Sequence, residues 1–247
     1  MPQNNKPGLH DITGALRLLT RLPLRPSARI TPPQAAWAWP LAGAIVGALA
    51  ALVAMAAQPL GAGIAAALVL GIQAMMTGAL HEDGLADTAD GLWGGWDKAR
   101  RLLIMKDSHI GTYGVMALLV VGLVRWSALA GLIGAEQFWV IVVVGAMSRA
   151  PMALLMAALP NARGSGLSQT VGQVPRAAAG IGVLIATGFA LTLGAAGLVG
   201  LFGIVVAVSG LAMMARAKIG GQTGDILGAS QQLAEATALC LIAAHLT

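Results

Sequence analysis

Residues 138–159 read FWVIVVVGAMSRAPMALLMAAL, an apolar stretch with Arg149 as its one charged residue. A helix needs about 20 residues to cross the roughly 30 Å hydrocarbon core of a bilayer, and this stretch is long enough. The runs are continuous and rich in Ala, Leu and Gly rather than alternating, which argues against membrane-spanning strands. Six further stretches of this kind lie at 36–57, 60–80, 113–133, 178–194, 197–215 and 226–246. The sequence therefore predicts an all-α polytopic membrane protein with about seven transmembrane helices.

Composition supports this fold class. Of the 247 residues, 57% are hydrophobic and only 10% are charged, whereas about 25% are charged in a typical soluble domain. This excludes a water-soluble globule, a disordered chain and a coiled coil. The formal charge of +5 would suggest a nucleic-acid partner in a soluble protein. Here we interpret it as the Lys/Arg excess of cytoplasmic loops, so we expect the lipid bilayer and no nucleic acid as a partner. A homo-oligomer is compatible with the sequence.

The basic residues predict the orientation in the membrane. The N-terminal segment 1–35 has no apolar run long enough for a signal peptide, and 9–22 within it has the pattern of a short amphipathic helix. The connections near 58–60, 134–137 and 194–197 contain no Lys or Arg. The N-terminus is thus expected in the cytoplasm and the C-terminus outside, in one integral domain, 1–247. Thirteen of the fifteen basic residues fall on the predicted cytoplasmic side: Lys6, Arg17, Arg21, Arg25, Arg29, Lys98, Arg100, Arg101, Lys106, Arg163, Arg176, Arg216 and Lys218.

Three ionisable residues lie inside predicted spans, at similar depths: Arg125, Arg149 and Glu235. Charged groups within the bilayer are costly, so each needs a partner or a role. One interpretation is a structural Arg–Glu pair that locks helices together. The other is that these side chains line a polar cavity open to the cytoplasm.

The connection 81–112 holds six of the ten acidic residues. On a helix, where each residue advances 100°, Asp83, Asp87 and Asp90 share one narrow stripe, whereas Glu82 points about 100° away. Stacked carboxylates repel each other, so the stripe favours a divalent cation such as Mg²⁺, which also bridges to substrate phosphates. The glycines at 84 and 91 would permit close approach of a ligand, or simply punctuate the helix.

Basic residues follow the acidic stripe. Arg100, Arg101 and Lys106 can reach phosphate oxygens, as can Lys98. A second polar turn places Asp225 at the start of the last span, either as a helix N-cap or as a second carboxylate facing the stripe. His81 and His109 are isolated and do not form a zinc pattern. Metal and basic residues together indicate phosphoryl transfer involving a phosphoanhydride.

Three motifs resemble the cobalamin synthase family of adenosylcobinamide-GDP ribazoletransferases. They are GALHEDGLADTADG at 78–91, RRLLIMKDSHIGTYG at 100–114 and GGQTGDILGA at 220–229. The shorter segments TRLPL, WPLAG and SRAP, which begin at 20, 39 and 148, are also similar and occur in the family's order. The resemblance covers most of the chain.

The resemblance implies a reaction and a location. The ribose 3′-hydroxyl of α-ribazole, or of its 5′-phosphate, would attack the cobinamide-side phosphorus of adenosylcobinamide-GDP. GMP would leave, and adenosylcobalamin or its 5′-phosphate would form. The family is membrane-bound and Mg²⁺-dependent, which implies a bacterial inner membrane and an active site on the cytoplasmic face.

The resemblance also implies residue roles. Glu82 stands where the family often has an apolar residue and is not assigned as a ligand. Either Asp107 or Asp225 would orient or deprotonate the attacking hydroxyl. The implied roles are metal binding by Asp83, Asp87 and Asp90, catalysis by Lys106, Asp107 and Asp225, and substrate binding by His81, Arg100, Arg101, Arg149 and Glu235.

Two alternatives belong to other classes. Residues 87–91, DTADG, match the opening D-x-x-D-G of CDP-alcohol phosphotransferases, although Gly94 and Gly95 replace the Ala-Arg pair that should follow. A membrane transferase of CDP-alcohol or prenyl type is therefore one alternative. A transporter with Arg125, Arg149 and Glu235 as a relay is the other.

Overall fold

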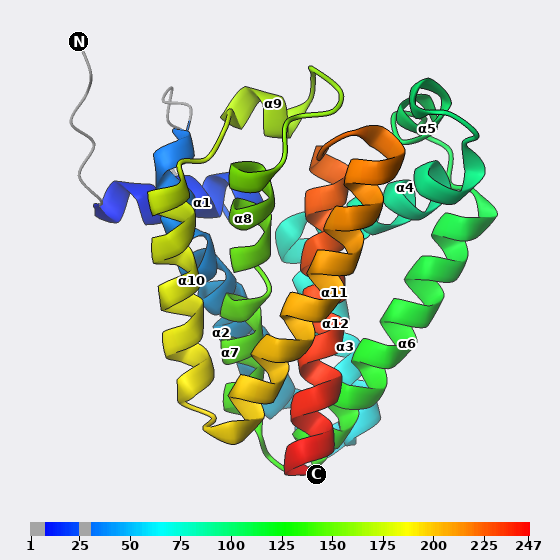
Figure 1. Ribbon diagram of the computed structural model, residues 1–247. Helices are drawn as coiled ribbons and strands as arrows, with labels where there is room; N and C mark the ends of the chain where they lie inside the picture. The colour runs from blue at the N-terminus through cyan, green and yellow to red at the C-terminus, as the bar shows by residue number, and fades with distance from the viewer. Residues whose placement is uncertain (1–7, 25–30) are drawn as a thin grey trace.

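The computed structural model describes residues 8–24 and 31–247, and it is built from helices (Figure 1). Within these ranges no strand forms, and the one β-bridge joins Asn161 to Gln222. Lys6, Arg25 and Arg29 lie outside the described residues. The helices are α1 (Leu9–Leu19), η1 (Pro33–Ala38), α2 (Trp39–Ala57), η2 (Gln58–Leu60), α3 (Ala62–Thr77), α4 (Leu80–Gly94), α5 (Lys98–Ile104), α6 (Thr112–Gly134), α7 (Phe138–Met147), α8 (Ala150–Ala158), α9 (Leu167–Val171), α10 (Arg176–Leu191), α11 (Ala195–Ile219) and α12 (Gly224–Leu246).

The all-α, multi-pass architecture predicted from the sequence is confirmed, but the number of long spans is lower. In the described part of the chain, five helical segments are long and apolar enough to cross a membrane, and a sixth arises if the bent pair α3–α4 counts as one span. The predicted span 178–194 corresponds to α10, which is apolar but has only 16 residues. The five long segments are Pro33–Leu60, Thr112–Gly134, Phe138–Ala158, Ala195–Ile219 and Gly224–Leu246.

Helix α12 packs against α11, α4 and α6 near the centre of the bundle (Figure 1). It has the lowest mean hydropathy of the five long segments, 1.3, and most of its surface is buried. Its polar side chains cannot face lipid without a large cost, so they turn inward. Helix α6, with a mean hydropathy of 2.0, is mostly uncovered by protein and suits a lipid-facing position.

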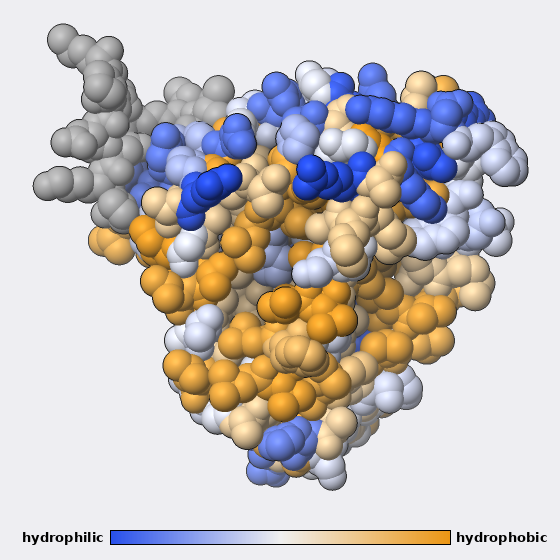
Figure 2. Space-filling view, in the orientation of Figure 1, coloured by the Kyte–Doolittle hydropathy of each residue, from blue (hydrophilic) through white to orange (hydrophobic). Residues whose placement is uncertain are grey.

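The chain turns sharply between α3 and α4. Gly78 and Ala79 both have left-handed backbone conformations, with φ of 64° and 55°, and the two helices meet at 91°. Helix α4 consequently leaves the direction of the spans and runs across one end of the bundle (Figure 1). Hydrophilic residues gather at that end, whereas the sides below are largely apolar (Figure 2). The acidic stretch of the predicted connection 81–112 is therefore helical, as the stripe of aspartates assumed.

Two of the three glycines of α4, Gly84 and Gly91, serve helix packing. A Cβ atom on Gly84 would lie 2.9 Å from the carbonyl oxygen of Asp225 and 3.0 Å from the Cα of Gly228. A Cβ on Gly91 would meet the side chain of Met105 and the backbone of Arg101. Both glycines lie within α4, so they do not punctuate the helix, and the neighbouring chain at these positions leaves no room for a Cβ atom.

Substitution of Gly84 by valine should therefore force α4 away from α12. We expect a loss of about 1–3 kcal/mol of stability from this overpacking, with a lower thermal midpoint in detergent. The matched control is Gly71→Val on α3, where a Cβ would meet nothing within 4 Å among the described residues. Equal midpoints for the two variants would contradict the close α4–α12 crossing.

Candidate active site

Three hollows at the polar end meet at Asp83, which is exposed on α4. The inner pocket is lined by both charged and apolar side chains, and includes Trp39, His81, Asp83, Arg163 and Asp225. The outer groove includes Glu82, Asp83, Asp87, Lys106, Asp107 and His109. The third hollow includes Arg17, Arg21 and Asp83. The shared Asp83 makes these hollows parts of one surface.

The acidic stripe is only partly available to a metal ion. Asp83 and Asp87 both line the outer groove, but Asp90 is buried beyond it. The Asp90 carboxylate accepts hydrogen bonds from the backbone N–H groups of Gly111 (2.7 Å) and Gly114 (2.9 Å), at the start of α6. No group of three potential ligands forms a ready metal site in the described ranges. The predicted three-aspartate set is thus reduced to two carboxylates that face the groove.

The surroundings of Asp87 favour a cation. Burial raises the pKa of its carboxyl group to about 7, and the neighbouring carboxylates of Asp225 and Asp83 act in the same direction. A nearby positive charge would relieve this repulsion. Mg²⁺ is held by one or two carboxylates together with water and substrate phosphates, so the pair formed by Asp83 and Asp87 fits that ion.

Arg100 and Arg101, to which the sequence assigned the same role, have different surroundings in the structure. Arg100 lines a hollow with Lys106 and Asp107, next to the outer groove. Arg101 instead turns to α11, where its Nη1 donates to the carbonyl oxygen of Lys218 at 3.1 Å. Lys106 therefore lines the outer groove, Arg100 lines the hollow next to it, and Arg101 supports the α5–α11 contact.

Asp107 is exposed and paired with His109, the residue two positions later. The distance from the His109 Nδ1 to the Asp107 Oδ1 is 2.7 Å. This hydrogen bond lowers the pKa of the Asp107 carboxyl and raises the pKa of the His109 imidazole. His109, to which the sequence analysis assigned no role, thus lines the groove as the hydrogen-bond partner of Asp107.

Asp225 is held by an arginine that sequence reasoning used only for membrane orientation. The Nη2 of Arg163 lies 2.6 Å from the Asp225 Oδ2, and the hydroxyl of Thr223 donates to the same oxygen at 3.1 Å. Thr223 is the N-cap of α12, since its hydroxyl accepts from the N–H of Ile226. Asp225 is consequently not the N-cap, and it lines the inner pocket. No local sequence pattern links Arg163 to Asp225, which lies 62 positions away.

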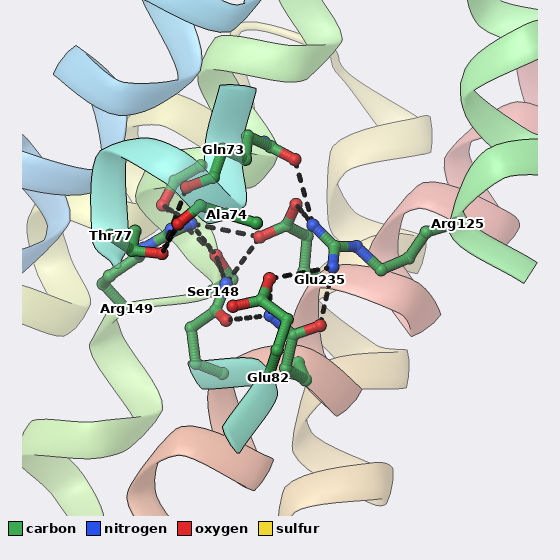
Figure 3. Close-up of polar contacts among 11 residues, drawn as sticks. Gln73, Ala74, Thr77, Glu82, Arg125, Ser148, Arg149 and Glu235 are labelled. Atoms are coloured by element: carbon green, nitrogen blue, oxygen red, sulfur yellow. Dashed lines mark hydrogen bonds and ion pairs between the residues drawn. The ribbon is translucent and has the colours of Figure 1, made fainter. Parts of the chain in front are cut away.

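The three ionisable residues inside the spans form one buried network (Figure 3). Glu235, which is 2% exposed, accepts from Arg125 at 2.8 Å and from Arg149 at 3.1 Å. Gln73 accepts from Arg125 at 2.9 Å, and Gln232 accepts from the same guanidinium at 2.6 Å. The network joins α3, α6, the α7–α8 break and α12. Neither Arg149 nor Glu235 lines any of the three hollows, so these contacts favour the structural interpretation over the polar cavity.

Glu82 connects this network to the outer groove. Its Oε1 accepts from Gln232 at 3.0 Å and lies 3.5 Å from Arg125, while the residue also lines the groove beside Asp83. The helical geometry that set Glu82 apart from the stripe agrees with this position. His81, the residue before Glu82, is buried and lines the inner pocket.

The fold and the hollows together define a multi-pass helical membrane protein with a charged site at one end. This arrangement suits a membrane-bound phosphoryl-transfer enzyme. The model of the cobalamin-5-phosphate synthase family matches residues 11–243. The chain belongs to this family.

Individual relatives agree with that assignment. The adenosylcobinamide-GDP ribazoletransferase of Bradyrhizobium diazoefficiens is 44% identical, over 95% of this chain and 93% of that protein. The protein of the same name from Mesorhizobium japonicum is 40% identical, over 97% and 95%. No solved structure matches the chain.

Proposed function

We propose that this protein is a membrane-bound transferase with the activity named for its relatives, adenosylcobinamide-GDP ribazoletransferase. It would join the adenosylcobinamide-phosphate group to the 3′-hydroxyl of α-ribazole or of its 5′-phosphate, in the assembly of cobalamin. The observation that carries the proposal is the position of Asp83, where a partly apolar pocket meets a groove lined by carboxylates and a lysine. One hollow suits an acceptor and the other a pyrophosphate.

The reaction exchanges one P–O bond for another. The 3′-oxygen of the acceptor bonds to the cobinamide-side phosphorus while that phosphorus loses its bridging oxygen, which leaves with GMP. The proton of the hydroxyl passes to a carboxylate or to water. Most of the catalysis in such a transfer comes from positioning and from neutralising the charge on the phosphates.

The residues at the two hollows divide this work. Lys106 and Arg100, on the groove side, would stabilise the charge of the leaving GMP. Asp225, on the pocket side, would orient the attacking hydroxyl, because Arg163 and Thr223 fix the direction of its carboxylate. Asp107 lies with Lys106 rather than with the pocket, so we place it on the leaving-group side.

Asp83 and Asp87 would hold Mg²⁺. When bound, the ion would neutralise phosphate charge and help to align the pyrophosphate. Asp90 would act indirectly, by fixing the start of α6 and thereby the segment that carries Lys106 and Asp107. We further propose that the charged end faces the cytoplasm of a bacterial inner membrane, in line with the basic residues near it. A homo-oligomer remains compatible with this arrangement.

Substitution of Lys106 by alanine is expected to lower kcat/KM by about 10- to 10²-fold, because one cation at the leaving group is lost. Lys98→Ala is the matched control: the sequence grouped Lys98 with the residues that can reach phosphate, but Lys98 lies on α5 outside both hollows that Lys106 lines. Steady-state rates of GMP release measure both. Equal activities of the two variants would remove Lys106 from the proposed site.

The function is tested with the purified protein and identification of the product. Adenosylcobinamide-GDP and α-ribazole are supplied with Mg²⁺ or with EDTA, and the products are analysed by mass spectrometry. We expect adenosylcobalamin with Mg²⁺ and none with EDTA. Turnover of a CDP-alcohol with a lipid acceptor, and none of the cobinamide substrate, would support the CDP-alcohol alternative instead.

A further inference from the structure

Two residues that line the inner pocket have buried ring nitrogens that lack hydrogen-bond partners in the described part of the chain. They are the Nε1 of Trp39 and the Nε2 of His81, in side chains that are 3% and 2% exposed. Both residues line the pocket. An indole N–H is a donor only, and a buried donor without an acceptor is costly. A ligand that offers an acceptor to this pocket would remove that cost.

The walls of the inner pocket restrict the kind of ligand further. Its apolar lining includes the side chains of Met152, Met156, Leu167, Val171 and Leu227. Its charged lining residues are Asp83, Arg163 and Asp225, and Ser165 and Ser168 also line it. A matching ligand has a flat, mostly apolar ring system with few polar atoms, joined to a polar group such as a sugar. Methionine walls adapt well to planar rings.

The bases of the two substrates of the proposed reaction differ in the number of their hydrogen-bonding groups. The edge of a guanine carries several donors and acceptors, and those that face the apolar lining would stay unpaired at a considerable cost. The base of ribazole is a dimethylbenzimidazole, whose two methyl groups are apolar and whose ring has one unsubstituted nitrogen as its acceptor. The pocket therefore fits the base of ribazole better than it fits guanine.

We propose that the inner pocket binds the benzimidazole base of the acceptor nucleoside, with the indole N–H of Trp39 donating to the free ring nitrogen of that base. This inference rests on the proposed function and adds the subsite and a residue that determines specificity. His81 supplies a second polar group in the same pocket. The ribose then lies toward Asp225 and toward Asp83, which the pocket shares with the outer groove.

The first test compares two ligands on the unmodified protein. Isothermal titration, without the cobinamide substrate, measures the affinity for α-ribazole and for its indole analogue, in which a C–H replaces the free ring nitrogen. We expect the analogue to bind about 10-fold more weakly, since it leaves the Trp39 N–H unpaired. Equal affinities for the two ligands would overturn the proposed hydrogen bond.

The second test removes the donor. Trp39→Phe keeps an aromatic ring but has no N–H, so it should bind α-ribazole and the indole analogue within about twofold of each other. A preserved 10-fold preference in this variant would assign the recognition of the ring nitrogen to another residue. Thermal midpoints in detergent show whether the variant is folded, and the comparison on the unmodified protein decides the question if it is not.

The third test fills the pocket. Val171→Phe should raise the KM for α-ribazole at least about 10-fold and leave the KM for adenosylcobinamide-GDP within about twofold. Arg100→Ala, on the groove side, should show the opposite pattern. An increase confined to the KM for adenosylcobinamide-GDP in Val171→Phe would place the other substrate in this pocket. If the unmodified protein binds α-ribazole as expected but releases no GMP, the proposed function fails while the subsite stands.

Discussion

Replacement of Asp83 by asparagine is expected to lower the turnover number by at least about 10²-fold while the protein stays folded. Among the described residues, Asp83 is the one that all three hollows at the polar end share, and its side chain is exposed. The substitution keeps the size of the side chain and removes its charge. It therefore removes one of two proposed Mg²⁺ ligands at the place where acceptor and pyrophosphate meet.

The control for this variant is Asp97→Asn, on the same end of the molecule. The Asp97 side chain caps α5 by accepting from the N–H of Arg100, and asparagine caps equally well. The GMP-release rate of the control should stay within about twofold of the unmodified protein. Full activity of Asp83→Asn, with an unchanged thermal midpoint, would exclude Asp83 from the metal site and the mechanism.

Replacement of Glu235 by glutamine is expected to destabilise the fold by about 3–5 kcal/mol. The substitution leaves Arg125 and Arg149 buried without their shared counter-charge, within helices that lie in the membrane. Unpaired charges at that depth are costly, so the variant should unfold at a clearly lower temperature in detergent. Low yields from the membrane would accompany the shift.

The same variant separates the two interpretations of the buried charges. Glu136→Gln is its matched control, because Glu136 is exposed in the connection between α6 and α7 and has only a weak contact with Gln58. Exposed pairs contribute little, so the midpoint of the control should not move. A Glu235→Gln protein with normal stability but no binding of substrate would restore the substrate-binding role that the sequence resemblance implied.

The membrane helices could be predicted from sequence because the bilayer fixes both the length and the polarity of a span. The bend after α3 could not, because a hydropathy window averages over Gly78 and Ala79 and contains no information on their left-handed backbone. The amphipathic helix predicted at 9–22 is present as α1, with Leu19 as its last residue.

The site was predicted only in part, because sequence patterns report positions within one helix and not contacts between distant segments. Helical periodicity correctly separates Glu82 from the aspartates, since it depends only on positions within α4. Periodicity cannot predict which other segments the aspartates contact, and Asp90 is hydrogen-bonded to the start of α6. The partners Arg163 and Trp39 are distant in sequence from Asp225 and His81, so only the folded chain brings them into one pocket.

The most direct test of the central claim is the dependence of GMP release on the acceptor. Purified protein with Mg²⁺ and adenosylcobinamide-GDP should release GMP only when α-ribazole or its 5′-phosphate is added, with one cobalamin product formed per GMP. GMP released at the same rate without an acceptor would identify a hydrolase. No release with the acceptor present would contradict the assignment of this site to the transfer reaction.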